Sequence, residues 1–537
     1  MAVARYGETA ASCFPWPRSR AAANTYPGTG FPGRELAVTT FRKLGAHSAT
    51  YAATTLLQKA ATFLLMPVYT LYLDPTAFGT LAIVTAVNGF LSIVFTLGLT
   101  GAVARFYFEY REDHTALAEF WGSIFVFVIL LSLLMGAVLL LIGPWVLRPF
   151  IGDVPFWPFM ALGIITTCFQ PLFTTFLTLL QTRNQAIQYS VVSIANFLLT
   201  TVLTIVLVVL KQWGATGALT ATLVSSAIFF AISMYLLRSD VRLCLRWRYL
   251  REAFAYSLPQ VPHSVASQAT AMADRLILNS RLGTAAAGLY SVGAMIAMVV
   301  EVAAYSVNRA YFPVSMSAMK SMDPVQLGRM RVLGSLVVAG FCLLGAAVAA
   351  FGPELVHLLT TPAFSGATQV IPVLVFGGVS SALYYLLVNV LFFDRHAVKL
   401  LPVCTLTGAT LNVTLALLLI PRFNLMGAAV ANLLAQAFAT VLVGVIGRRF
   451  DPVQWDYGRY GMAIAVSFAV TLSLSRLVGV GWTVLALAKV SCLLILAILL
   501  GTILWRRPLI LADAVVQLLQ RRPDRAAALF MPARAST

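Results

Sequence analysis

Ionisable side chains interrupt stretches of this sequence that are otherwise long and apolar enough to cross a lipid bilayer. The stretch QATAMADRLILNSRLG (268–283) sets Asp274 beside Arg275. A charged side chain is costly inside hydrocarbon, so intramembrane ionisable residues usually face a partner, a water-filled cavity or a transport pathway. Neighbouring helical residues point about 100° apart, and these two charges therefore cannot easily neutralise each other. The pair is a candidate for substrate binding or for ion exchange.

A polar stripe accompanies this pair. In the segment 252–280 its members are spaced by 3, 4, 3 and 4 residues, which places them on one helical face: Gln260, His263, Ser267, Thr270 and Asp274. The segment 44–72 carries a matching stripe of Tyr51, Thr54 or Thr55, Gln58 and Thr62. Such faces either line a shared, water-accessible cavity or bond across a dry helix interface. His263 and Asp274 favour the cavity, with Gln58, His263 and Ser267 among its polar ligands.

Two carboxylates are candidates for ion coupling. Asp274 has a short side chain that cannot extend far toward the headgroups, so it suits a cavity cation, a proton or a sodium ion. Glu301 shares a helical face with Tyr305 and Asn308. It either takes part in function or lies protonated and hydrogen-bonded in a packed interface.

Basic side chains supply the opposite charge. Lys59, near the middle of the segment 44–72, is the strongest cationic candidate, because at that depth it needs an anion, a carboxylate or water. Arg309 and the adjacent Asn308 lie near one mouth of the proposed cavity. Arg275 either lines the cavity or extends to the headgroups, and we expect Lys489, near a segment end, to extend to the headgroups.

The elements that must position these residues are transmembrane helices. The chain is 60% hydrophobic and 10% charged, and no alternating strand pattern accompanies its apolar stretches. A span needs about 20 apolar residues. On that rule we predict an all-α polytopic membrane protein with about fourteen helices, at 44–72, 77–104, 117–143, 156–180, 186–210, 215–237, 252–280, 285–312, 330–351, 368–392, 397–420, 424–447, 460–479 and 482–504.

The formal net charge of +18 is distributed unevenly between the two sides of the predicted membrane domain. If the chain starts on the inner side, inner segments hold 29 of the 37 Lys and Arg residues. The outer side then holds five, namely Arg148, Lys211, Arg281, Arg422 and Arg476. By the positive-inside rule, both termini are cytoplasmic and the number of helices is even. The excess charge predicts contact with membrane lipids, and it does not indicate a nucleic-acid groove.

An internal repeat relates the first twelve segments. GALTATL (217–223) and GAAVANL (427–433) share the pattern Gly-Ala-x-x-Ala-x-Leu, and an ungapped shift of 209 residues superposes Ala77 on Ala286 and Gly79 on Gly288. Many transporters consist of such repeats around a midplane site. We predict a disordered extension at 1–40, an N-terminal six-helix bundle at 41–250, a C-terminal six-helix bundle at 251–450, two appended helices at 451–507 and a cytoplasmic tail at 508–537.

Motifs for covalent, nucleotide or metal chemistry are missing from the sequence. It has no Gly-rich phosphate loop, HExxH, CxxC or Asp-x-Asp pair, and its five histidines have no ligand spacing. The predicted loops leave no room for a soluble catalytic domain. We therefore expect neither an enzyme nor a cofactor or metal, and any uphill transport must draw on an ion gradient or a substrate gradient.

The segment SLPQVPHSVASQATAMADRLILNSRLGTAAAGLYSVGAMIAMVVEVAAYSVNRAYFPV (257–314) resembles the polysaccharide transport flippases, which include O-antigen and exopolysaccharide flippases. The shared features are an early Leu-Pro, ADR, LG followed by GLYSVG, and a closing Asn-Arg-Ala-x-Phe-Pro. The two Gly-Ala repeats are also similar. This family belongs to the multidrug/oligosaccharidyl-lipid/polysaccharide exporter superfamily, and the resemblance covers about residues 40–505.

The resemblance implies a two-lobed protein of the bacterial inner membrane. It would move an undecaprenyl-pyrophosphate-linked oligosaccharide to the outer leaflet, with H+ or Na+ as candidate coupling ions and with polysaccharide polymerase and export machinery as candidate partners. Lys59, Arg275, Arg309 and His263 would hold the pyrophosphate. A lipid II flippase and a cation-coupled multidrug antiporter of the same superfamily stay open as alternatives. A membrane glycan polymerase or ligase is a third, although it usually needs a large outer loop.

Overall fold

The computed structural model describes residues 65–394, 396–474 and 482–505, together with 50, 54, 56–59 and 63. Within these ranges the chain is helical, without strands. The described residues belong to one compact unit. The predicted extension at 1–40 and tail at 508–537 lie outside the described residues, as do Tyr51, Thr55, Thr62 and Arg476. The division at residue 250 stays a prediction.

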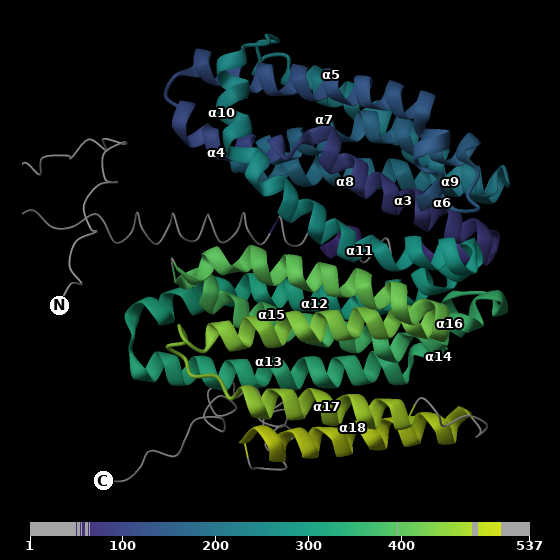
Figure 1. Ribbon diagram of the computed structural model, residues 1–537, viewed down its shortest axis with the longest axis vertical. Helices are drawn as coiled ribbons and strands as arrows, with labels where there is room; N and C mark the ends of the chain where they lie inside the picture. The colour runs from purple at the N-terminus through teal and green to yellow at the C-terminus, as the bar shows by residue number, and fades with distance from the viewer. Residues whose placement is uncertain are drawn as a thin grey trace, which may run out of the picture. The chain divides into compact units, whose positions relative to one another are not determined.

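The first group of helices covers residues 66–257. Its members are α2 (Met66–Tyr72), α3 (Pro75–Thr96), α4 (Leu99–Tyr110), α5 (His114–Val146), α6 (Arg148–Ile151), η1 (Phe156–Met160), α7 (Ala161–Thr182), α8 (Ala186–Thr204), η2 (Ile205–Leu210), α9 (Gly214–Leu237) and α10 (Trp247–Ser257). Figure 1 shows α3 to α10 together on one side of this unit.

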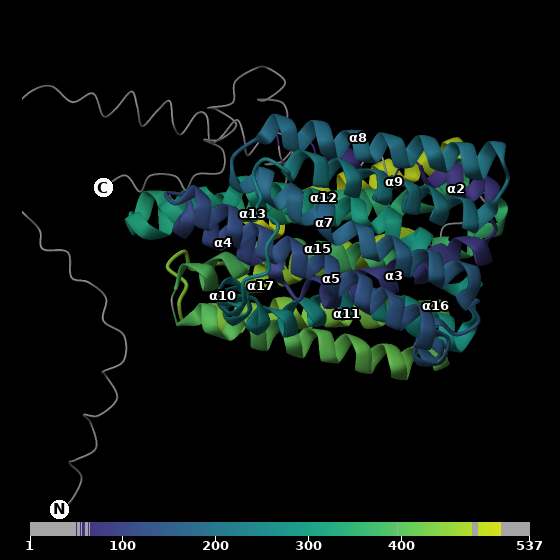
Figure 2. The ribbon, with the colours of Figure 1, turned by 90° about the horizontal axis from the view of Figure 1, so that it is seen from above.

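The second group follows a short turn, η3 (Leu258–Gln260). Its members are α11 (Val261–Leu282), α12 (Thr284–Ser321), α13 (Pro324–Ala350), α14 (Gly352–Leu359), η4 (Pro362–Gln369), α15 (Ile371–Phe393), η5 (Ala397–Leu400), α16 (Leu401–Gly447), α17 (Tyr457–Leu474) and α18 (Trp482–Trp505). In Figure 1, α11 runs between the first group and α12 to α18. Figure 2 shows that the long helices run roughly parallel.

The helices begin where local chemistry favours it. Asp74, Asp113 and Asp323 each accept a hydrogen bond from a backbone N–H of the first turn, and two of these caps precede a proline. Such caps satisfy backbone donors that the helix leaves unpaired. Ten helices of the described residues are long and apolar enough to span a membrane. The prediction of an all-α polytopic membrane protein is therefore confirmed.

Several predicted boundaries are wrong, and backbone conformation explains why. The predicted helix 77–104 is divided by Leu97 and Gly98, which both have positive φ, into α3 and α4. The predicted helix 252–280 is interrupted by η3, which contains Pro259. The predicted end at 312 is also wrong, because α12 continues through Pro313 to Ser321. One boundary agrees with the prediction: Asn424, also at positive φ, divides α16 between the predicted helices 397–420 and 424–447.

We name the two ends of this helical unit by residues. The end at which α3 and α12 begin is the Gly79 end, and the end at which α11 and α16 begin is the His263 end. The centre of the second group is α15, whose residues are mostly buried. Its sequence is apolar on all sides, as expected for a helix surrounded by other helices.

An ion pair fixes α18 to α14, and it corrects the expectation for Lys489. The Lys489 side chain is 3% exposed, and its ammonium group forms an ion pair with Glu354 while it lies 5.4 Å from the centre of the Phe351 ring. It therefore does not extend to the headgroups. A nearby carboxylate keeps this cation inside the protein.

Removing one member of this pair should destabilise the protein strongly. We expect Lys489→Ala to cost roughly 3 kcal/mol, because it leaves the Glu354 carboxylate partly buried without a cation. Thermal unfolding of the purified protein in detergent measures the loss. The double variant Lys489→Met, Glu354→Gln should recover most of the stability. A single variant as stable as the unaltered protein would contradict this assignment.

Candidate functional site

A cavity of about 590 Å³ lies among α11, α12, α15 and α16. Pockets that bind small molecules commonly have volumes of about 300–1,000 Å³. Its polar and ionisable lining comes from all four helices: His263, Ser267, Thr270, Asp274, Arg275, Tyr290, Glu301, Ser381, Tyr384, Tyr385, Thr405, Asn432 and Gln436. An otherwise apolar helical unit therefore contains a cavity able to hold water and a polar ligand.

The polar face of α11 is directed into this cavity. His263, Ser267, Thr270 and Asp274 all line it, in agreement with the helical spacing in the sequence. Gln260 instead donates a hydrogen bond to the Tyr256 carbonyl oxygen one turn earlier. The face thus extends from the His263 end of α11 to the middle of the membrane-spanning unit.

Asp274 is the more enclosed of the two carboxylates in the cavity lining, with 3% of its surface exposed. The Tyr290 hydroxyl donates a hydrogen bond to Oδ2 at 2.7 Å, and the Asn432 amide donates to the same oxygen at 3.3 Å. Asn412 also faces the carboxylate, but without hydrogen-bond geometry. The carboxylate therefore connects α11, α12 and α16, and its second oxygen is free of protein hydrogen bonds within the described residues.

Charges from distant parts of the sequence meet near this carboxylate. Arg275 lines the cavity, and one guanidinium nitrogen donates to the Ala271 carbonyl oxygen at 3.1 Å. Glu301 lies on α12 with its side chain exposed to the cavity. Arg275 and Lys59 are the cations whose charges act on the Glu301 carboxylate. Of the two alternatives for Arg275, the structure therefore supports the cavity.

His263 lines the cavity from the first turn of α11. Its side chain is exposed, and its Nδ1 atom is 3.1 Å from the Thr405 hydroxyl on α16. This contact joins the beginnings of α11 and α16. Because the ring remains accessible, His263 can still meet a ligand that enters from this end.

Four predicted site residues lie outside the cavity lining. The Gln58 amide donates to the Ser193 carbonyl oxygen on α8, and Lys59 is exposed without an ion pair in the described part of the chain. The Arg309 guanidinium lies over the Tyr305 ring at 4.8 Å. Asn308 accepts a hydrogen bond from Asn389 at 2.9 Å.

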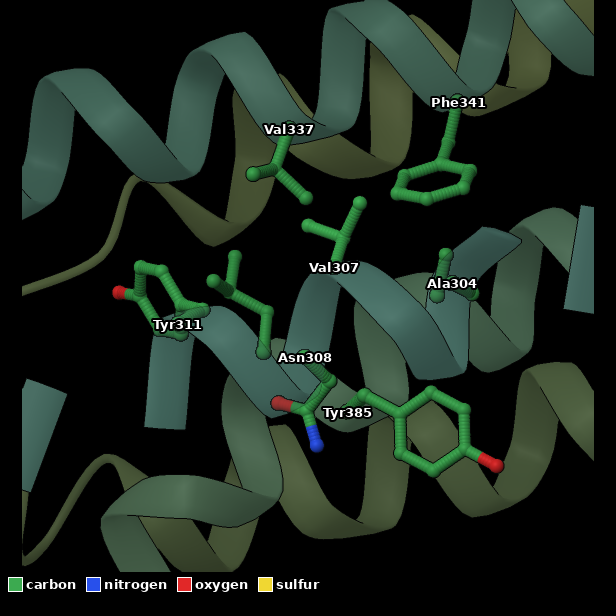
Figure 3. A pocket seen from close by; sticks show the side chains of 9 residues that line it. Ala304, Val307, Asn308, Tyr311, Val337, Phe341 and Tyr385 are labelled. Carbon is green, nitrogen blue, oxygen red and sulfur yellow. The ribbon is translucent and has the colours of Figure 1, made fainter. Parts of the chain in front are cut away.

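Asn308 borders a different and much smaller space. This second pocket lies among α12, α13 and α15 and is mostly apolar, as Figure 3 shows with Val307, Val337 and Phe341 around it. Its volume is about 10 Å³, which is room for about one water molecule. Tyr385 lines both pockets, whereas Asn308 lines only the smaller one. Asn308 therefore does not reach the large cavity.

Two expectations about the cavity need correction. We expected polar faces of residues 44–72 and 252–280 to line it together, yet the described lining residues all come from α11, α12, α15 and α16. Thr54 and Gln58 bond instead to Ser190 and Ser193 on α8. We also expected four basic side chains, Lys59, Arg275, Arg309 and His263, to meet there, but Lys59 and Arg309 lie outside the described lining, whose charged residues are Asp274, Glu301 and Arg275.

Sequence reasoning missed the residues that hold Asp274. Asn432 lies inside the repeat GAAVANL, where the other copy, GALTATL, has Thr222 at the matching position. A polar residue at the same position of both copies could have indicated that Asn432 has a polar partner. Tyr290, in GLYSVG, gave no signal by spacing, because its contact with Asp274 depends on how α12 packs on α11. Among the described residues, no three His, Cys, Asp or Glu side chains cluster to hold a metal.

Solved membrane proteins share this arrangement of helices. The lipid II flippase MurJ in an inward closed conformation superposes with a TM-score of 0.65 at 12% identity, over 86% of this chain and 99% of that one. An inward-facing multidrug resistance MATE family transporter of the MOP superfamily superposes with a TM-score of 0.57 at 15% identity, over 77% of this chain and 98% of that one. This chain therefore shares the fold of these two membrane proteins.

The sequence itself identifies the family. The pattern of the polysaccharide biosynthesis protein family matches residues 44–319, which is 276 of 537 residues, and the chain belongs to this family. It is 23% identical over 381 residues to Lsg locus putative protein 1 of Haemophilus influenzae, covering 69% of this chain and 90% of that protein. An uncharacterized membrane protein of the same organism is 25% identical over 299 residues, covering 54% and 70%. The expected polysaccharide family is thus confirmed.

The cavity should admit a water-soluble reagent only from the His263 end. In a variant with all six native cysteines replaced, we expect Ser267→Cys to react with a membrane-impermeant maleimide at least about tenfold faster than Ser291→Cys, because Ser267 lines the cavity and Ser291 is buried. Labelling rates in membrane vesicles of each orientation measure this. Equal rates at both positions would show that the cavity is closed to water.

Proposed function

We propose that this protein moves an undecaprenyl-pyrophosphate-linked oligosaccharide from the cytoplasmic to the outer leaflet of a bacterial inner membrane, for surface polysaccharide export. The observation that carries the proposal is a water-accessible cavity with charged walls inside an apolar helical unit of the polysaccharide biosynthesis family. A polar head group needs such a path, while a polyprenyl tail can remain in lipid.

The head group of this substrate carries both sugar and pyrophosphate. Hydroxyl and amide side chains, such as Ser267, Thr270 and Gln436, suit a sugar. Arg275 and Lys59 would hold the pyrophosphate, since neither forms an ion pair within the described residues. Charge-assisted hydrogen bonds are strongest away from bulk water. In the empty cavity, the Glu301 carboxylate would balance the charges of these two side chains. When the substrate binds, its pyrophosphate would take the place of Glu301.

Energy for transport would come from an ion gradient. Asp274 and Glu301 are the carboxylates of the cavity and therefore the candidates to exchange H+ or Na+. Asp274 has one oxygen held by Tyr290 and Asn432 and one oxygen left for a cation. A cation bound to that oxygen would change the net charge of the cavity by one unit. This net charge would affect how strongly an anionic substrate binds.

The orientation follows from charge. Basic residues are concentrated in the segments at the His263 end, including Arg238, Arg242, Arg246, Arg248 and Arg251. The positive-inside rule makes this end cytoplasmic and puts the Gly79 end outside. The cavity would then admit its substrate from the cytoplasm. Alternating access between the two ends would complete the translocation.

A second candidate is a cation-coupled multidrug antiporter. Its organic cations would favour an acidic and aromatic lining, and the cavity does contain Asp274 and Glu301 together with Tyr290, Tyr384 and Tyr385. Stacked aromatic rings and carboxylates bind organic cations well. A lipid II flippase would use the same cavity chemistry with a different sugar.

Loss of a charge that lines the cavity or acts on its carboxylates should abolish export. We expect Lys59→Ala and Asp274→Ala each to remove at least about 90% of surface glycan, because a step that loses one charge-assisted contact slows by a factor of ten or more. Surface glycan and membrane protein level are measured together. Arg329→Ala and Glu112→Ala, which remove exposed charges elsewhere, are the matched controls.

The identity of the retained lipid separates the candidates. Cells that lack the protein should accumulate a lipid-linked oligosaccharide on the cytoplasmic side. Accumulated lipid II would favour the lipid II flippase, whereas unchanged lipid-linked sugars with new sensitivity to cationic drugs would favour the antiporter. Normal glycan output from both Lys59→Ala and Asp274→Ala would make these charges structural.

A further inference from the structure

At the Gly79 end, the two halves of the repeat touch through their backbones. A Cβ atom on Gly79 would lie 2.0 Å from the Thr284 carbonyl oxygen, and a Cβ atom on Gly288 would lie 2.0 Å from the Pro75 carbonyl oxygen. Real Cβ atoms do not approach backbone so closely. Glycine at both positions is therefore what allows α3 and α12 to meet.

These contacts obey the sequence repeat. A shift of 209 residues converts Gly79 into Gly288 and Pro75 into Thr284, so each contact is the counterpart of the other with the halves exchanged. The two glycines lie next to each other, with a Cβ on either one 3.0 Å from the backbone nitrogen of the other. The point of contact is therefore its own counterpart under the sequence repeat.

A second pair of contacts follows the same shift to within one residue, and each is made by an almost fully buried side chain, that of Thr70 or of Asn279. The Thr70 hydroxyl on α2 donates to the Leu359 carbonyl oxygen at 2.8 Å, and the Thr361 hydroxyl donates to the Thr70 carbonyl oxygen at 3.3 Å. The counterpart of Thr70 is Asn279 on α11, whose amide donates to the Ile151 carbonyl oxygen beside Gly152. Thr361 and Gly152 are themselves 209 residues apart.

This set of contacts separates two cavities. Along α11 the order is Asp274 in the central cavity, then Asn279, then Leu282 in a second cavity of about 560 Å³. Along α12 the order is Tyr290 in the central cavity, then Gly288, then Thr284 in the second cavity. The second cavity opens at the Gly79 end. The two spaces thus face opposite ends and are divided where the repeat-related contacts lie.

We propose that these four contacts form a gate, and that its two symmetric halves open together. The gate consists of the backbone contacts at Gly79 and Gly288 and the hydrogen bonds of Thr70 and Asn279. All of its members are neutral, so its opening exposes no unpaired charge. The gate deepens the proposed function, on which it rests for its role in translocation, by naming the residues that close the outer side.

Alanine at either glycine should open the gate. We expect Gly79→Ala and Gly288→Ala each to raise labelling of Ser267→Cys from the Gly79 end about tenfold, because the added methyl group meets a backbone carbonyl that cannot move aside. Gly328→Ala and Gly340→Ala are the controls, since a Cβ at these helical positions meets nothing within 4 Å. Unchanged labelling in both gate variants, or a change in only one, would overturn the proposal.

A cross-link tests the gate in a protein that keeps both glycines. We expect Thr70→Cys with Thr361→Cys, in the background without native cysteines, to form a disulfide that holds the gate closed. Oxidation should then lower glycan export at least about tenfold, and a reductant should restore it in the same protein. Export at the unaltered rate in fully cross-linked protein would overturn the gate.

The two experiments separate the gate from the substrate. Labelling of Ser267→Cys measures access to the cavity and needs no substrate. If the substrate proves to be a drug or lipid II, the labelling results still decide whether these contacts close the Gly79 end. If labelling is unaffected by the glycine variants while Lys59→Ala abolishes export, the gate fails and the proposed function stands.

Discussion

The hydrogen bonds of the Asp274 carboxylate are the interaction on which the cavity depends. A carboxylate inside a membrane protein must be paired, protonated or hydrated, and here the Tyr290 hydroxyl and the Asn432 amide hold one of its oxygens. Because the three residues lie on α12, α16 and α11, one side chain fixes where three helices meet. The neighbouring walls remain apart, and a cavity of about 590 Å³ is left beside the carboxylate.

Charges of both signs lie in and beside the cavity. Two carboxylates, Asp274 and Glu301, and one cation, Arg275, line it, and Lys59, outside the lining, also acts on the Glu301 carboxylate. Protonation of a carboxylate would make the net charge here more positive and favour binding of an anionic head group. Ionisation of the carboxylate would favour release of that head group or binding of a cation. Under the proposed function, substrate binding and ion binding would influence each other through this charge, without a conformational signal between separate sites.

Symmetry and packing act together at the opposite end. Glycines superposed by the sequence repeat bring α3 and α12 into backbone contact, and buried hydrogen bonds of Thr70 and Asn279 flank that contact. The Lys489 and Glu354 pair then fixes α18 beside α14. Neutral contacts lie where the halves touch, and the buried ion pair lies where the appended helices pack.

Composition and periodicity by themselves determined the helical membrane class, the repeat and the polar face of α11, since burial in lipid constrains each segment independently of its neighbours. Local backbone signals such as Asn424 were partly readable, whereas the division of α3 from α4 was not. Only the tertiary structure decided that Gln58 turns to α8, that Asn308 borders another pocket and that Tyr290 holds Asp274. These outcomes depend on which helices become neighbours. The sequence of one segment does not specify which distant segment its side chains will contact.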